Sequence, residues 1–133
     1  MKNGSFISTL FLVTFGLYST SYAEDWKQFF ANKAGYTFSF DKDSLAYPDK
    51  YRVQVWFRSV PDEAEIKVWL EWLELREVDC NRRRYKTLQG RVLYEDKPME
   101  VLKESNWVYL EPNQLEDSFY KAVCSQRKQR NSR

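Results

Sequence analysis

Two cysteines, Cys80 and Cys124, constrain the fold more than any other feature of this 133-residue sequence. An even number of cysteines in an exported protein is typical of disulfide pairing, because oxidising compartments form such bonds and keep them. The alternative is a redox-active or metal-binding thiol pair, but the sequence has no Cys-x-x-Cys spacing and no histidine. We therefore predict a Cys80–Cys124 disulfide, which stabilises the fold by about 4 kcal/mol in the chain-entropy model.

Export is predicted from residues 1–23. Lys2 supplies a positive charge, residues 6–18 are mostly apolar, and Ser21 and Ala23 place small side chains where a signal peptidase reads them. The alternative is a membrane anchor or a buried helix, but the apolar stretch is shorter than the roughly 20 residues that span a bilayer. We expect cleavage after Ala23 and a mature chain that begins at Glu24.

The predicted mature chain suits one folded domain, because removing 23 residues from 133 leaves 110. It has 20 basic residues (21 less Lys2) and 19 acidic ones, so its charge of +1 does not drive it onto nucleic acid or anionic lipid. No second apolar stretch is long enough for a transmembrane helix. We place the domain at 24–124 and expect the basic segment 125–133 to be disordered, with contact to anionic envelope surfaces as its functional alternative.

Most of the mature sequence has the alternating pattern of β-strands. In residues 36–40, aromatic residues alternate with Thr37 and Ser39, and in residues 51–59 valines and Phe57 alternate with polar residues. Turn-forming residues such as Pro61 and Pro98 separate the segments. The predicted strands are 36–40, 51–59, 66–79, 83–94, 99–102 and 107–110.

The segment 66–79 has two interpretations. Ile66, Val68 and Leu70 share one strand face, whereas Leu73 and Leu75 fall on the other. A strand with a bulge near Trp72 would explain this change of phase, and so would a helix with Ile66 and Leu73 on its apolar stripe. Tryptophan and β-branched residues favour the bulged strand.

A helix is predicted after Asn113, which can act as its N-cap with Glu116 three residues later. Apolar residues then recur at helical spacing, and Cys124 falls at the helix end. A sheet with one apolar face needs a cover, and this helix can supply it. The predicted fold is therefore α+β: one antiparallel sheet of five to six strands, with a C-terminal helix packed on it and tied by the disulfide.

The order of several short motifs resembles one known family. The motifs are Trp26, the turn Asp41-Lys-Asp-Ser-Leu45, the strand Val53-Gln-Val-Trp56, Val78-Asp-Cys80 with Tyr85 behind it, Trp107-Val-Tyr-Leu-Glu-Pro112, and the helix end Tyr120-Lys-Ala-Val-Cys124. Together they are similar to the surface-adhesin protein E family of small exported bacterial proteins, over nearly the whole mature chain.

This resemblance implies a sheet whose concave face holds the C-terminal helix, and attachment to host extracellular-matrix and plasma proteins. The adhesin itself is anchored by a lipid, whereas this chain has no lipid-acceptor cysteine at the predicted cut. The expected location is therefore the periplasm or the medium, with the cell surface as a further option.

The residue inventory argues against an enzyme. The absence of histidine excludes Ser-His-Asp and Cys-His catalysis, and the sequence has no glycine-rich phosphate loop. A glycosidase-like carboxylate pair could come from Glu71, Glu74, Glu77 and Asp79, but charged residues on a strand usually form a solvated face. We predict no catalytic residue, no cofactor and no metal.

Two groups of side chains could serve binding. Arg82, Arg83, Arg84 and Lys86 concentrate positive charge that could bind a partner's carboxylates, sulfates or phosphates, or could simply protect a strand edge. Four tryptophans, at 56, 69, 72 and 107, could be platforms for glycans or proteins, although burial is the commoner role.

We therefore predict an exported, non-catalytic, adhesin-like module that recognises a macromolecule, protein or glycan, at the cell envelope or surface. The alternative is a periplasmic structural domain without a host ligand. A small hydrolase would need two carboxylates converging in a cleft.

Overall fold

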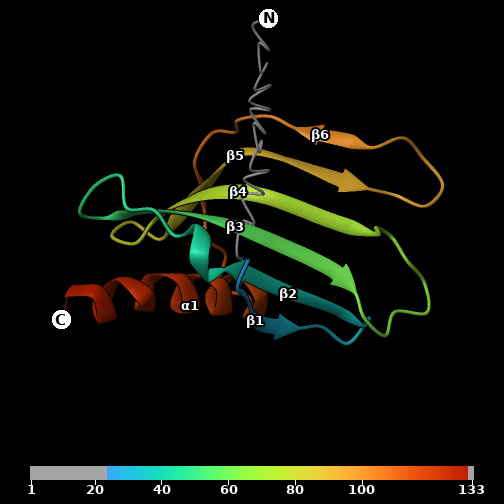
Figure 1. Cartoon of the computed structure of the whole chain (residues 1–133), viewed down its shortest axis with the longest axis horizontal. Helices are drawn as coiled ribbons and strands as arrows, with labels where there is room; N and C mark the ends of the chain where they lie inside the picture. Colours follow the sequence, from blue (N-terminus) through green and yellow to red (C-terminus); the bar gives the residue numbers. More distant parts are fainter. Residues whose placement is uncertain (1–23, 132–133) are drawn as a thin grey trace, which may run out of the picture.

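The computed structural model describes residues 24–131, so the predicted signal segment 1–23 lies outside the described residues. Seven strands form one sheet in the order β1-β2-β3-β4-β5-β6, with β7 paired to β5, and one long helix, α1, follows. Figure 1 shows α1 lying close to β1 and β2, with β6 at the far edge of the sheet. The elements are β1 (Trp26–Ala31), β2 (Tyr36–Asp41), the 3-10 turn η1 (Lys42–Ser44), β3 (Arg52–Pro61), β4 (Glu71–Asp79), β5 (Arg84–Leu93), β6 (Glu100–Leu102), β7 (Val108–Tyr109) and α1 (Gln114–Asn131).

This architecture confirms the predicted fold class. Every strand pair is antiparallel, and β1 to β6 follow one another in the sheet as they do in the sequence. The Cys80–Cys124 disulfide is present, with an S–S distance of 2.04 Å. It joins the end of β4 to α1, as predicted.

Strand β1 was not predicted from the sequence. Its pairing with β2 shifts register between Gln28 and Phe30, so that both Phe29 and Phe30 pack against the core. A bulge of this kind destroys simple alternation, which explains why the pattern gave no strand there. The Phe29 ring lies 5.4 Å from that of Phe119 on α1, which ties this edge strand to the helix.

The segment 66–79 is a strand only from Glu71 onward, so the helical interpretation is wrong. Residues 66–70 belong to the loop between β3 and β4, where Ile66 is 81% exposed. The predicted bulge near Trp72 is also wrong. The irregularity in the β4–β5 pairing lies farther along, where Leu88 of β5 is left without a partner opposite Leu75 and Arg76.

Asn113 caps α1 as predicted, because its side-chain oxygen accepts a hydrogen bond of 2.9 Å from the backbone N–H of Glu116. The helix does not end at Cys124. It continues to Asn131, where the sequence predicted disorder from residue 125. Arg127 holds this extension to the sheet, since its guanidinium donates to the backbone oxygens of Arg52 and Asp49.

The core lies between α1 and one face of the sheet. Phe119 and Val123 of the helix are fully buried with Val53, Val55 and Phe57 of β3. Full burial of an aliphatic or aromatic side chain contributes about 1.5–3 kcal/mol, so these contacts and the disulfide together fix the helix. We call the face that packs on α1 the inner face, and we call the opposite one, which carries Arg52, Gln54, Trp56 and Arg58 of β3, the outer face.

Candidate functional site

The outer face is an alternation of charge across three strands. Glu77 of β4 lies opposite Gln54 of β3 and Lys86 of β5, and Asp79 lies opposite Arg52 and Arg84. Ion pairs follow this register, with Arg84 Nε 3.1 Å from Asp79 Oδ2 and Lys86 Nζ 3.7 Å from Glu77 Oε2. Opposite charges on neighbouring strands stabilise the pairing and hold each cation in one position.

A second set of cross-strand ion pairs lies farther along the same face. Glu71 of β4 pairs with Arg58 of β3 at 3.2 Å and with Arg91 of β5 at 3.4 Å. Acidic residues of the central strand thus lie between basic residues of its neighbours.

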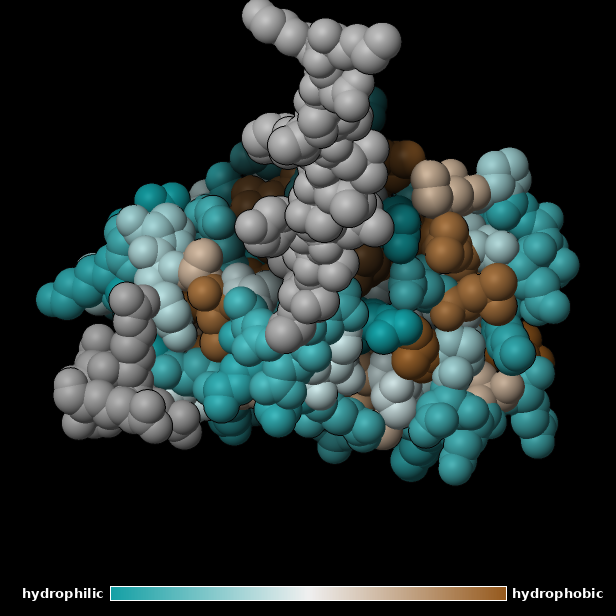
Figure 2. Space-filling view, viewed as in Figure 1, coloured by the Kyte–Doolittle hydropathy of each residue, from teal (hydrophilic) through white to brown (hydrophobic). Residues whose placement is uncertain are grey.

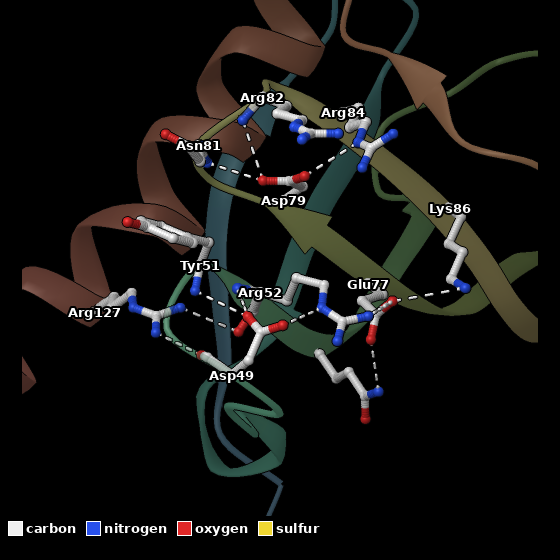
Figure 3. A network of polar contacts seen from close by, with 11 residues as sticks. Asp49, Tyr51, Arg52, Glu77, Asp79, Asn81, Arg82, Arg84, Lys86 and Arg127 are labelled. Carbon is white, nitrogen blue, oxygen red and sulfur yellow. Dashed lines mark hydrogen bonds and ion pairs between the residues drawn. The ribbon is translucent and has the colours of Figure 1, made fainter.

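At one end of the outer face these charges surround a hollow of about 350 Å³, which we call the charged hollow. Figure 3 shows the polar contacts around it. Its walls are Asp49, Tyr51, Arg52, Asp79, Asn81, Arg82, Arg84 and Trp107.

Asp79 organises one wall of the charged hollow. Its carboxylate accepts hydrogen bonds from the backbone N–H groups of Asn81 and Arg82 and from Nε of Arg84, all at 3.0–3.1 Å (Figure 3). This is an Asx-type turn, and Arg83, later in the same loop, has a left-handed φ of 51°. The turn between β4 and β5 is therefore fixed by a carboxylate directly before the disulfide.

Asp49 organises the opposite wall. Its carboxylate accepts from the backbone N–H of Tyr51 and pairs with Arg52 Nε at 2.6 Å. The Tyr51 N–H and the Arg52 guanidinium hold the pKa of Asp49 below its ordinary value. The same pair raises the pKa of Arg52, so both groups are charged at neutral pH.

The four predicted basic residues are divided by the fold. Arg84 and Lys86 point to the outer face and both lie over the Trp107 ring, 4.4 Å and 5.1 Å from its centroid. Arg82 lines the charged hollow together with Arg84 (Figure 3). Arg83 instead points toward α1, where it pairs with Asp117 at 3.1 Å and covers the Tyr120 ring.

The four tryptophans are divided in the same way. Trp69 and Trp72 pack against the core, with ring centroids 5.4 Å apart. Trp56 and Trp107 are half-buried on the outer face and therefore present part of their rings to solvent.

A second hollow, of about 320 Å³, lies on the outer face and is called the apolar hollow here. It is lined by Trp56, Leu73, Gln89, Gly90, Arg91, Val101 and Leu102. Figure 2 shows that hydrophobic side chains gather on this half of the molecule, on the right, over β4–β6 and the loops at that end. At Gly90 the backbones of β4 and β5 leave no room for a side chain, since an added Cβ would lie 2.4 Å from the carbonyl oxygen of Leu73.

The model of the surface-adhesin protein E family matches residues 26–125. The chain belongs to the surface-adhesin protein E family. The match includes all seven strands, both cysteines and α1 as far as Ser125. No curated protein and no solved structure matches the chain.

Membership in the surface-adhesin protein E family indicates an adhesin-like, non-catalytic protein with an exported or surface location. In the part of the chain from 24 to 131, no helix is long and apolar enough to cross a membrane. No group of three or more acidic or cysteine side chains in that part is placed to hold a metal ion.

The prediction that the four carboxylates of β4 form a solvated face is wrong for this member of the surface-adhesin protein E family. Glu74, Glu77 and Asp79 are all buried, and only Glu71 is partly exposed. Burial is tolerated because each carboxylate has a basic partner, as for Glu74 with Arg76 at 3.0 Å. Glu74 also points to the inner face while Glu77 and Asp79 point to the outer face, so the four carboxylates do not converge.

Sequence reasoning missed several residues of the charged hollow. Asp49 and Arg52 come from the loop before β3 and its first residue, thirty or more positions before the basic cluster. No local motif links them to Arg82, because the β3–β4 and β4–β5 pairings bring them together. The one available signal was the Asp49-Lys-Tyr-Arg52 sequence, whose acid and base are spaced to pair across a turn.

Proposed function

We propose that this member of the surface-adhesin protein E family is an exported, non-catalytic binding module that recognises a macromolecular partner through the charged hollow. The Arg82 side chain carries this proposal. Among the described residues, the other two arginines of the hollow each pair with an acidic side chain, whereas the Arg82 guanidinium has no acidic partner. A partner's carboxylate, sulfate or phosphate can supply one.

The surroundings of Arg82 favour recognition over chemistry. The Trp107 ring and the Arg84 guanidinium form a rigid wall, because Asp79 holds the arginine and the arginine covers the ring. Preorganised groups of this kind bind with a smaller loss of conformational freedom. Arg82, Arg84 and Lys86 are the residues of the predicted cluster that we assign to binding, and Arg83 is assigned to anchoring α1.

The experiment compares the natively exported protein with Arg82→Ala and with Lys33→Ala, which removes an exposed cation in the β1–β2 turn. Fractionation first locates the tagged protein, and immobilised protein is then exposed to material from that compartment and from host matrix. We expect a partner to be retained by wild type and Lys33→Ala and lost from Arg82→Ala. Strict periplasmic residence would exclude a surface adhesin, and equal retention by Arg82→Ala would exclude the charged hollow as the binding site.

A further inference from the structure

We propose that the outer face binds an acidic polysaccharide, whose chain lies along the strands across both the charged hollow and the apolar hollow. This rests on the proposed function, because the charged hollow is one end of the same site. The proposal adds a ligand class and a second binding position at Trp56.

The two hollows are positions on one strand. Arg52 lines the charged hollow, and Trp56, four residues later on β3, lines the apolar hollow. Strands rise about 3.3 Å per residue, so the two positions are about 13 Å apart along the sheet. A ligand that touches both must be an extended chain of several repeating units.

Each hollow has an aromatic wall. Trp107 bounds the charged hollow and Trp56 bounds the apolar hollow, and both residues are partly exposed. The face of an aromatic ring carries negative charge density and attracts polarised C–H groups, which a sugar ring presents on one side. Two such rings at separate positions of one face suit two sugar rings of one chain.

The surface between the hollows is polar and offers both donors and acceptors. Gln54 Nε2 donates to Glu77 Oε1 at 3.0 Å, and Lys86 Nζ lies 3.7 Å from the other oxygen of the same carboxylate. The Glu77 carboxylate is buried, but the amide of Gln54 and the ammonium group of Lys86 are partly exposed and can serve hydroxyl groups, each of which donates and accepts. A polyhydroxyl chain fits this strip better than an apolar one.

The charge of the site favours widely spaced anions. The charged hollow has three arginines and two aspartates in its wall. At the apolar hollow, Arg91 shares the Glu71 carboxylate with Arg58, so two cations face one carboxylate there. Each position therefore has one positive charge in excess, and between them Glu77 is paired with Lys86. A densely charged polymer such as nucleic acid has far more negative charges than these two positions can balance, whereas one acidic group per few sugars is matched.

An acidic peptide fits this face less well. Extended peptides usually bind a sheet by adding a strand to its edge, where backbone groups are free to pair. Trp56 and its neighbours on β3 lie in the middle of the sheet, between β2 and β4, and present side chains only. Side-chain stacking and hydroxyl recognition are the interactions that such a surface offers.

The test measures binding of the natively exported protein to four immobilised polymers: hyaluronan, which has carboxylates only, heparin, which also has sulfates, neutral dextran, and poly-glutamate. We expect binding to hyaluronan, weakened by salt, and none to dextran or poly-glutamate. Hyaluronan binding at least as tight as heparin binding assigns the carboxylate as the recognised group, whereas binding to heparin alone would show that charge density decides and would overturn the proposal. Binding to dextran or poly-glutamate at equal affinity would overturn the proposal.

Variants then test the two positions separately. Arg82→Ala and Arg91→Ala should each lower affinity about tenfold, the loss expected for one hydrogen bond to a charged group. Trp107→Ala and Trp56→Ala should each lower it about fivefold through lost stacking. Ile66→Ala, which removes an exposed apolar side chain outside both hollows, should have no effect.

Arg91 keeps the test decisive if Trp56→Ala fails to fold, because its side chain is half-exposed and its loss leaves the core intact. If Arg82→Ala and Trp107→Ala lose affinity while Arg91→Ala and Trp56→Ala bind as the wild type does, the two-position site is overturned. Retention of a protein partner through Arg82, without binding to any polysaccharide, would overturn this inference and leave the proposed function standing. If the wild-type protein retains no partner of any kind, both this inference and the proposed function fail.

Discussion

Arg76 and Glu74 form an ion pair inside the protein, with Nε and Oε1 3.0 Å apart and both side chains more than 90% buried. The Nε contact lacks hydrogen-bond geometry, and Nη2 makes the hydrogen bond to the carboxylate instead, at 3.3 Å. The guanidinium lies 3.8 Å from the centroid of the Phe57 ring and 4.5 Å from that of Tyr85. Trp72 and Thr87 donate to the carboxylate, so its remaining lone pairs are also used.

Removing one partner of this pair should be far more damaging than removing both. Arg76→Met leaves a buried carboxylate without its cation, and Glu74→Leu leaves a buried guanidinium, so each should lower the free energy of unfolding by about 3–5 kcal/mol. The double variant should recover most of that loss, because hydrophobic side chains can fill the same space. Urea denaturation of the three variants measures the coupling.

Arg91→Met is the matched control for this cycle, since Arg91 pairs with Glu71 with about half of its side chain exposed. It should change stability by no more than about 1 kcal/mol. Additive effects of the two buried substitutions would show that the pair is not a unit.

The disulfide should be a stabilising link that folding of the sheet does not require. Replacing both Cys80 and Cys124 by alanine should lower the free energy of unfolding by about 4 kcal/mol, because the unfolded chain regains the freedom of a long loop. The helix keeps other anchors, including the hydrogen bond from the Tyr120 hydroxyl to the Cys80 carbonyl and the Arg127 contact with Arg52.

Denaturation of the wild type with and without reductant should reproduce the shift seen for the alanine variant. The same reductant should leave the variant unchanged, which controls for effects unrelated to the bond. Mass spectrometry that finds two free thiols in the natively exported protein would contradict this prediction.

The fold was predictable where apolar and polar residues alternate and caps are local, as in β2, β3 and the start of α1. It was not predictable in β4, because charged residues point inward there and leucines point outward. Glu74 and Arg76 face the core, whereas Leu73 and Leu75 face the outer side. This inversion produced the apparent phase change that the sequence suggested was a bulge.

The candidate site shows a similar division. Charge density in the sequence indicated Arg82, Arg84 and Lys86, but it could not separate them from Arg83, which the left-handed turn directs to α1. Nor could it show that Asp79 and Glu77 neutralise two of these cations, because cross-strand register decides which charges meet. Binding at these residues stays a prediction.

Gly35, in the turn between β1 and β2, packs against the loop that follows β3, and no room is left there for a side chain. Its φ is +91°, and an added Cβ would lie 2.4 Å from the backbone nitrogen of Ala64. Its carbonyl oxygen also accepts from the backbone N–H groups of Asp62 and Glu63, at 2.9 and 3.0 Å. Gly35→Ala should therefore lower the free energy of unfolding by roughly 1–3 kcal/mol through backbone strain and overpacking.

Thermal and urea denaturation check this effect, with Ala34→Gly at the neighbouring exposed position as control. The control should be lower in stability only by the added freedom of its unfolded chain, at most about 1 kcal/mol. A Gly35→Ala variant as stable as wild type would mean that the two loops can move apart.

Tyr85 should make the protein sensitive to alkaline pH. Burial raises the pKa of Tyr85 above its ordinary value of 10.0, with the Arg76 guanidinium partly opposing the shift. Between that ordinary value and the raised pKa, the unfolded chain loses the phenol proton while the folded protein keeps it. The unfolded state then binds fewer protons, so the free energy of unfolding falls as pH rises above about 10.

Denaturation of the wild type and of Tyr85→Phe across this pH range isolates the effect, because phenylalanine keeps the ring beneath Arg76 but has no proton to lose. The free energy of unfolding of Tyr85→Phe should fall less steeply with rising pH than that of the wild type. Tyr109→Phe, which alters a ring that is 66% exposed, should decline as the wild type does. Parallel curves for the wild type and Tyr85→Phe would show that the buried phenol ionises as readily in the folded protein as in the unfolded chain.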